Sequence, residues 1–193
     1  MFHMKRCSWV PKDNQLYCDY HDLEWGQPLH DDRDFFELLC LESYQSGLSW
    51  LTVLKKRQAF RTVFHHYDIA SVATFTSEEL ADALENPSII RHKLKLAATV
   101  NNAIAVQKIQ EEFGSFSTYL WNFVGGKPIN NLVNQENLVP AQTELSIRLA
   151  KDLKKRGFKF LGPTTVYSFM QASGLVNDHE EACVFNRESS NSS

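Results

Sequence analysis

The chain has 193 residues, of which 43% are hydrophobic and 22% are charged, and its formal net charge is −3 at pH 7. This length is typical of one domain, and the balance of residue types excludes an intrinsically disordered chain. No apolar run approaches the roughly 18 residues of a membrane-spanning helix, and the N-terminus lacks the apolar core of a signal peptide. We therefore expect a cytoplasmic protein with one domain over residues 1–185 and a disordered tail over residues 186–193.

Signals for helices recur in the first half of the chain, and signals for strands do not. The first helix is expected to follow Asp32 as its N-cap, and its apolar residues keep a helical spacing. A second helix should begin at Ser49. Thr76 and Glu79 form a capping-box pattern ahead of a third helix, which the break at residues 86–88 ends.

The second half of the chain continues this pattern. A long helix is predicted over residues 91–112 and a shorter one over 117–124, and a loop rich in Gly, Asn and Pro follows over 125–142. Further helices are expected over residues 143–157 and 162–174, since glycine suits a helix end and proline suits a first helical turn. The sequence contains no internal repeat, so the predicted fold class is a compact all-α domain.

Cysteine and histidine residues at both ends of the chain are candidate metal ligands. The spacing of His179 and Cys183 places both on one face of a helical turn, close enough to share a metal ion. A tetrahedral zinc site needs two more ligands, and the N-terminal segment offers Cys7, Cys18 and His21. Spacing alone leaves open which cysteine would complete the site. It equally leaves open unpaired thiols and surface histidines.

The stretch "KKRGFKFLGPTTVYSFMQASG", residues 154–174, predicts two helices joined by a hairpin between Gly157 and Gly162. Glycines let the backbone turn sharply and approach a ligand, and the free N–H groups at the start of the second helix can hold a phosphate. An ordinary helix–helix connection is the alternative. Lys159 within the hairpin favours the phosphate site.

An acidic residue stands on the buried face of the first predicted helix. Glu42 lies four residues after Leu38, where the apolar face continues, and an ionised carboxylate there costs several kcal/mol unless it is paired. One explanation is an ion pair with Arg57. The other is a pocket for a cation or an amino group, covered by Trp50. Further candidates for this pocket are one glutamine on the same helix face and the aromatic residues near the N-terminus: Gln45, Trp9, Tyr17, Tyr20 and Trp25.

Taken together, these stretches resemble a known enzyme family. "RCSWV", "YHDLEWGQP", "LESYQSGLSWLTVLKKR", "IIRHKLK" and "KKRGFKFLGPTTVYSFMQASGLVNDH" are similar, in order, to the motifs of the 3-methyladenine DNA glycosylase I (Tag) family of base-excision repair enzymes. The resemblance covers nearly the whole chain, from Arg6 to Cys183. It implies a helix-hairpin-helix glycosylase that flips 3-methyladenine out of alkylated double-stranded DNA and releases it as the free base. We expect a monomer, because one lesion needs only one pocket. A non-catalytic DNA-binding module built on the same hairpin is the alternative function.

The resemblance also implies roles for individual residues. One structural zinc ion per chain would join the N- and C-terminal segments through Cys7, His21, His179 and Cys183. The base pocket would include Tyr20, Glu42 and Trp50, with Glu42 as the candidate catalytic residue. Contacts to DNA would come from Gly47, Leu48, Gly157, Lys159 and Gly162. Asp178 lies near the position of a catalytic aspartate in other helix-hairpin-helix glycosylases, an aspartate that this family is considered to lack.

The chemistry of the lesion explains why an acid would be buried. Methylation at N3 makes the purine cationic and weakens its glycosidic bond, so the enzyme must mainly extract the base and hold it. A buried carboxylate can accept from the exocyclic amino group and favour the positive charge, while Trp50 stacks on the base. Four protein ligands would leave zinc no open position for water, so its predicted role is structural.

Overall fold

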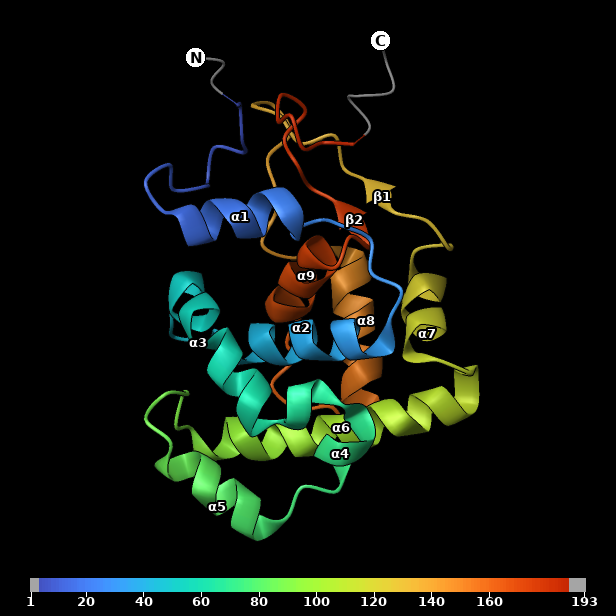
Figure 1. The fold of residues 1–193 in the computed structure, drawn as a ribbon. Coiled ribbons are helices and arrows are strands. Elements are labelled where there is room, and N and C mark those ends of the chain that lie inside the picture. The colour runs from blue at the N-terminus through green and yellow to red at the C-terminus, as the bar shows by residue number, and fades with distance from the viewer. Residues whose placement is uncertain (1–3, 188–193) are drawn as a thin grey trace.

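The computed structural model describes residues 4–187, which are mostly helical (Figure 1). The all-α fold class predicted from the sequence is therefore confirmed. The helices and strands, in chain order, are α1 (Gln15–Leu23), α2 (Asp32–Tyr44), α3 (Trp50–Val63), the 3-10 helix η1 (His65–Tyr67), α4 (Ile69–Ala73), α5 (Ser77–Glu85), α6 (Lys93–Phe113), α7 (Phe116–Phe123), β1 (Ile129–Asn130), α8 (Glu144–Lys155), α9 (Pro163–Ala172) and β2 (Val176–Asn177). None of the helices in the described part of the chain is both long and apolar enough to cross a membrane.

Polar side chains fix where the helices begin. The side chains of Asn14, Asp31 and Ser49 accept hydrogen bonds from the first turns of α1, α2 and α3, which satisfies N–H groups that have no partner within the helix. The capping box predicted for Thr76 and Glu79 is confirmed at the start of α5. Local sequence signals therefore set most helix boundaries.

The N-cap predicted at Asp32 is wrong by one residue, because Asp31 caps α2 instead. The Asp32 carboxylate has a longer-range role: it accepts hydrogen bonds from the backbone N–H groups of Phe116 and Ser117 at 3.0 and 2.8 Å. These two residues open α7, so Asp32 joins the starts of two helices that are distant in the sequence. A carboxylate at a helix N-terminus is also favoured by the helix dipole.

Helix α2 forms the centre of the molecule, and it packs against α3, α6, α7 and α9 (Figure 1). Every residue from 35 to 44 is buried, including the two acidic residues Glu37 and Glu42. A helix buried on all sides is normally apolar throughout. These two acids are therefore the positions at which α2 departs from the composition of a core helix.

A short parallel pair of strands, β1 and β2, was not predicted from the sequence. Ile129 pairs with Val176 and Asn130 with Asn177, and a further bridge joins Val133 to Glu180. Two residues are too few to produce an alternating pattern that a sequence could reveal. The pairing fastens the loop at residues 125–142 to the C-terminal segment.

Both ends of the described chain lie at the same end of the molecule (Figure 1). The helical turn predicted for His179 and Cys183 is wrong, because residues 179–183 form a bridge followed by a turn, in which the Cys183 N–H donates to the Glu180 carbonyl oxygen at 2.8 Å. Asn186, in the tail predicted as disordered, is buried and donates to the His179 carbonyl oxygen at 3.1 Å. The rest of that tail, from residue 188, lies outside the described residues.

Candidate functional site

A cavity of about 240 Å³ opens between α1, α2, α3 and α9. Pockets for drug-sized ligands are usually larger, at ~300–1,000 Å³, so this one suits a single flat ring system. Its lining contains Glu42 and all six side chains that the sequence indicated for this pocket, together with three others: Trp9, Tyr17, Tyr20, Trp25, Gln45 and Trp50, then Val139, Ser168 and Gln171. The structure therefore brings the predicted pocket residues together.

The Glu42 side chain is buried, and within residues 4–187 its carboxylate has no hydrogen-bond or ion-pair partner. Burial raises the pKa of Glu42 from 4.5 to about 8, because a charge is poorly solvated at this position. In the empty pocket the acid is therefore mostly protonated near neutral pH. A cation in the cavity would favour the ionised form and lower this pKa again.

The ion pair considered between Glu42 and Arg57 does not form. Arg57 instead donates to Glu37 and Glu24, in both cases at 2.6 Å, and Arg61 donates to both oxygens of Glu37 at 2.7 and 2.8 Å. Burial alone would raise the pKa of Glu37, but the hydrogen bonds and charges of these two arginines lower it below 4.5. Of the two buried acids on α2, Glu37 is neutralised by arginines and Glu42 faces a cavity.

Aromatic rings form two walls of this cavity. The ring centroids of Tyr20 and Trp50 lie 5.4 Å apart with their planes at 52°, and Trp9 packs edge-on against Trp25 at 4.8 Å. The buried indole N–H of Trp50 has no hydrogen-bond partner within the described residues. An unsatisfied buried donor is costly, and this nitrogen has almost no accessible surface, so the indole offers the cavity its ring and not its N–H group.

The turn between α2 and α3 projects beside the cavity. Gly47 has a φ of +80°, a conformation that favours glycine, and Leu48 is 37% exposed although it is a large apolar residue. Lys95, a buried residue on α6, fixes this turn by donating to the carbonyl oxygens of Tyr44 and Ser46 at 3.0 and 2.9 Å. A positive charge at the C-terminus of α2 also complements the helix dipole.

Helices α8 and α9 are joined by a tight turn that α6 holds in place. Gly157 has a φ of +92°, and its carbonyl oxygen accepts from Asn101 at 2.7 Å. Asn102 forms a reciprocal pair with the Lys159 backbone, accepting from its N–H at 2.9 Å and donating to its carbonyl oxygen at 3.1 Å. Gly162 then caps α9 without a side-chain hydrogen bond, so the first N–H groups of this helix are left for other partners.

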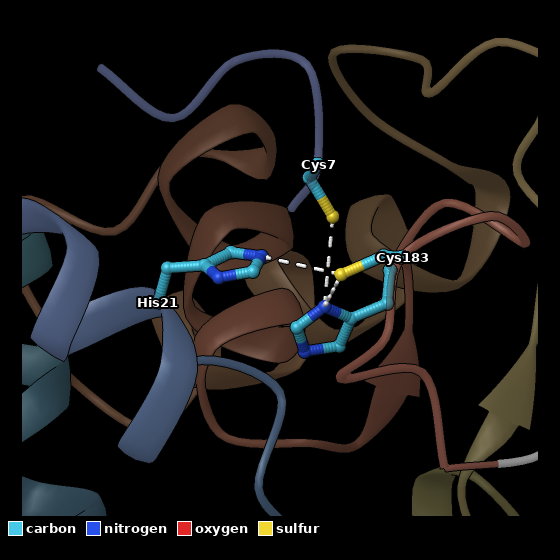
Figure 2. Close-up of side chains that lie close together, drawn as sticks. Cys7, His21 and Cys183 are labelled. Carbon is cyan, nitrogen blue, oxygen red and sulfur yellow. Dashed lines mark hydrogen bonds between the residues drawn. The ribbon is translucent and has the colours of Figure 1, made fainter. Parts of the chain in front are cut away.

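Four candidate metal-binding side chains from the two ends of the chain lie close together: Cys7, His21, His179 and Cys183. Figure 2 shows how Cys7, His21 and Cys183 converge. All four are buried, and their ligand atoms lie within 4.8 Å of one another. The sulfur-to-nitrogen distances of 3.5, 3.6 and 3.7 Å match the roughly 3.5 Å edge of a tetrahedron built from ~2.3 Å Zn–S and ~2.0 Å Zn–N bonds. The cluster therefore has the geometry to hold a metal ion.

Neighbouring groups orient the two imidazoles toward this cluster. His21 uses Nδ1 in its contact with Asp22 at 2.8 Å, which leaves Nε2 directed at Cys183, while His179 uses Nε2 in its contact with the Trp25 carbonyl oxygen at 2.9 Å. Such outer contacts are typical of metal-binding histidines. A hydrogen bond from Cys7, with others from the imidazoles, lowers the pKa of the Cys183 thiol. Cys18 lies elsewhere and donates to the Pro11 carbonyl oxygen, so it is not part of the cluster.

Comparison with known proteins shows which family the chain belongs to. The family model described as methyladenine glycosylase matches residues 9–187, which is most of the chain. The chain belongs to the methyladenine glycosylase family. The resemblance seen in the sequence motifs is thus confirmed at the level of the family.

Relatives within the methyladenine glycosylase family match along almost their full length. A curated relative, DNA-3-methyladenine glycosylase of Haemophilus influenzae, is 47% identical over 178 residues, covering 92% of this chain and 96% of the relative. The solved structure of 3-methyladenine DNA glycosylase I from Staphylococcus aureus is 41% identical, with a TM-score of 0.91, and covers 95% of this chain and 97% of that one. A variant of 3-methyladenine DNA glycosylase I solved in complex with 3-methyladenine is 40% identical, with a TM-score of 0.90, and covers 95% and 98% of the two chains.

Three lining residues of this methyladenine glycosylase cavity were not found from the sequence. Ser168 and Gln171 lie on α9, and Val139 lies in the loop at residues 125–142. Their spacing of three on α9 places Ser168 and Gln171 on one helix face, which is the only local signal that connects them. The sequence motif around α9 predicts the hairpin between two helices, but it does not predict that residues of α9 line the cavity.

Proposed function

We propose that this chain is a base-excision repair glycosylase that removes 3-methyladenine from alkylated DNA. The observation that carries the proposal is Glu42: a buried acid without a partner in the described chain, facing an aromatic cavity of the size of one base. Family membership and relatives named for this activity support the same substrate. A methylated purine is flat and cationic, and so it matches both the aromatic walls and the acid.

In the proposed reaction, DNA binding extrudes the damaged nucleotide, and the methylated base enters the cavity. As the cation arrives, Glu42 releases its proton to the solvent, and the carboxylate accepts a hydrogen bond from the base, which holds the base in place. The bond between the anomeric carbon and the purine nitrogen then breaks, and its electron pair neutralises the base. A water oxygen bonds to the anomeric carbon and releases its proton to the solvent, so the products are an abasic site and free 3-methyladenine.

The remaining lining residues would bind the base rather than react with it. Trp50 and Tyr20 would stack on or beside its ring, and Trp9 and Tyr17 would close the aromatic surround. Gln45 would supply a further polar contact from the end of α2. The positive charge makes the base a good leaving group, so the binding of an extruded base is the main task assigned to these side chains.

One prediction concerns Trp50. We expect Trp50→Ala to weaken the binding of free 3-methyladenine by ~1–3 kcal/mol, because a stacking surface is lost. Trp50→Phe is the matched control: it keeps an aromatic face and removes an N–H that has no partner in the described chain, so it should lose less affinity. Calorimetric titration of folded protein measures both variants. An alanine variant that binds as tightly as the parent would remove Trp50 from the proposed binding wall.

Contacts to DNA are assigned to the two projecting turns. Gly47 and Leu48 would enter the gap that the extruded base leaves, since this turn stands beside the cavity and presents an exposed leucine. The α8–α9 connection, which we assign as the helix-hairpin-helix motif, would hold a backbone phosphate through Gly157, Lys159 and Gly162. Braced by Asn102, this connection is held in one conformation before DNA arrives.

The hairpin assignment predicts the effect of Gly162→Asp. A Cβ at this position meets nothing within 4 Å, and Asp is a favoured N-cap, so the variant should fold at least as well as the parent. Its charge should repel a phosphate and weaken binding to damaged and undamaged duplex DNA by about tenfold at low salt, with less effect at high salt. Gly162→Asn is the control of equal shape without charge. Unchanged duplex affinity of Gly162→Asp across salt concentrations would refute the assignment.

We assign a structural zinc ion, one per chain, to the cluster of Cys7, His21, His179 and Cys183. Two thiolates and two imidazoles are the ligand set that zinc prefers, and four protein ligands leave no place for a reactive water. The ion would join the N- and C-terminal segments, which are distant in sequence. We further propose that residues 1–185 act as one domain and as a monomer, because one lesion needs only one pocket.

Base-release analysis tests the proposed activity. Purified protein is incubated with methylated duplex DNA, and the released bases are identified by chromatography against a sample without protein. We expect free 3-methyladenine to accumulate, with less released by Glu42→Gln. A non-catalytic DNA-binding module would bind the same DNA and release no base, and that result would overturn the proposal.

A further inference from the structure

Asp178 is buried at the end of β2, and three side chains donate to its carboxylate. Asn131 donates to Oδ1 at 2.6 Å, and Gln171 donates through Nε2 to Oδ2 at 2.9 Å. The Tyr167 hydroxyl also donates to Oδ2. A carboxylate whose two oxygens are both engaged within the protein is satisfied by the fold itself.

This arrangement separates Asp178 from the reacting atoms. Asp178 is 1% exposed and is absent from the lining of the base cavity, so it has no path to a base or to the anomeric carbon in this structure. Its neighbour Gln171, by contrast, lines that cavity. Any influence of Asp178 on the base would therefore act through Gln171.

The hydrogen bond to Asp178 determines how the Gln171 amide is oriented. An amide has a donating and an accepting end, and only the NH₂ group can point at a carboxylate. The carbonyl oxygen Oε1 is therefore turned away from Asp178, and within residues 4–187 no protein donor pairs with it. Because Gln171 lines the cavity, this oxygen is available to a ligand there as an acceptor.

We propose that Gln171 is a further base-recognition residue, whose carbonyl oxygen accepts from an N–H group of the bound base, and that Asp178 is the positioning residue that holds it in this orientation. The inference rests on the proposed function and adds to the cavity an acceptor from α9, besides the acid Glu42 from α2. It also assigns a purpose to an aspartate that takes no part in bond breaking. A purine that presents amino hydrogens to both acceptors would be favoured over one that presents carbonyl oxygens.

A double-mutant cycle on free-base binding tests the inference. Gln171→Met keeps the length of the side chain and removes the amide, so the affinity for free 3-methyladenine should fall by about threefold to tenfold. Asp178→Asn presents both an oxygen and an NH₂ group to the same three donors. The Gln171 amide can then rotate so that its NH₂ group points elsewhere, and we expect a similar loss of affinity for 3-methyladenine. Because Asp178 would act through Gln171, the double variant should lose no more than Gln171→Met alone.

Tyr167→Phe is the matched control for a purely structural effect. It removes one donor from Asp178 and leaves the hydrogen bond from Gln171 intact, so its affinity for 3-methyladenine should stay within about twofold of the parent while its melting temperature falls. If the fold-losses in 3-methyladenine affinity of the two single variants multiply in the double variant, the positioning role of Asp178 is overturned. Unchanged affinity in Gln171→Met would overturn the recognition role. If Asp178→Asn fails to fold, the comparison of Gln171→Met with Tyr167→Phe still decides the recognition role.

The parent protein separates failure of this inference from failure of the proposed function. A parent that binds no free 3-methyladenine contradicts the proposed function and, with it, the inference. If the parent and Gln171→Met bind equally well, only the inference is lost. Titration calorimetry on folded protein, with the melting temperature of each variant recorded, gives both answers in one series.

Discussion

Glu42→Gln is expected to stabilise the ligand-free protein by about 1–3 kcal/mol near neutral pH, although it replaces a buried residue. The folded pKa of Glu42 is about 8, above the ordinary value of 4.5. A group whose pKa is raised on folding costs no stability at low pH, where it is protonated in both states. Between about pH 4.5 and pH 8 the unfolded chain ionises first, so the folded state progressively loses stability. Glutamine does not ionise, so the variant does not lose this stability. The difference in unfolding free energy between variant and parent should therefore be absent near pH 4 and grow toward pH 8.

Glu37→Gln is the matched control on the same helix, and it should have the opposite effect. Arg57 and Arg61 lower the pKa of Glu37, so its ionised form stabilises the fold above about pH 4.5, and that stability is lost as the pH falls through the folded pKa. Removing the charge takes away the acidic partner of Arg61 and leaves Arg57 with Glu24 alone, and it should cost about 1–3 kcal/mol at neutral pH. Chemical denaturation across a range of pH measures the change in unfolding free energy of each variant relative to the parent. We expect an increase for Glu42→Gln and a decrease for Glu37→Gln. Destabilisation by Glu42→Gln at neutral pH would show that the acid has a partner in the fold.

Cys7→Ala is expected to have the largest effect on stability. Losing one of four ligands should release the proposed zinc ion, and because metal binding contributes directly to folding, the variant should lose at least ~3 kcal/mol. Both chain ends would loosen together, since Cys7 and His21 come from one end and His179 and Cys183 from the other. Metal analysis and thermal unfolding measure the two consequences, with one zinc per chain expected in the parent.

Cys18→Ala provides the control for this experiment. Cys18 is buried like Cys7 but lies outside the cluster, so this variant should keep its zinc and lose only the packing of one small side chain, about 1 kcal/mol. The zinc assignment would be wrong if the parent contained no zinc, or if Cys7→Ala kept both its zinc and its stability. Dialysis of the parent against a chelator should reproduce the loss of stability in Cys7→Ala.

Local signals in the sequence are enough to predict the longer helices and part of the pocket, whereas α1, η1 and α4 were not predicted. Side chains such as Ser49 and Thr76 act within one helical turn, so the helix starts they fix are visible in a short window of sequence. The position of Glu42 on an apolar helix face likewise indicates a buried acid from spacing alone. The four cysteine and histidine residues that we propose as zinc ligands follow from resemblance to a family, and the fold brings these four side chains together.

Contacts between distant segments cannot be predicted in this way. Spacing does not tell which of the four acids on α2 forms an ion pair with Arg57, and in the fold it is Glu37. The same reason hides Gln171, which joins the cavity only because α9 packs against α2. The sequence draws attention to Asp178 because it lies near the position of a catalytic aspartate in related glycosylases. Its proposed positioning role, however, depends on three donors that folding brings to it.

The central claim is that Glu42 is buried in order to bind a methylated base. Free 3-methyladenine titrated into folded parent and folded Glu42→Gln tests this claim most directly, because neither DNA binding nor bond cleavage enters the result. We predict that the parent binds the base and that the variant binds it more weakly by ~1–3 kcal/mol, the usual contribution of a charge-assisted hydrogen bond. Equal affinities in the two proteins would contradict the claim and remove Glu42 from base recognition.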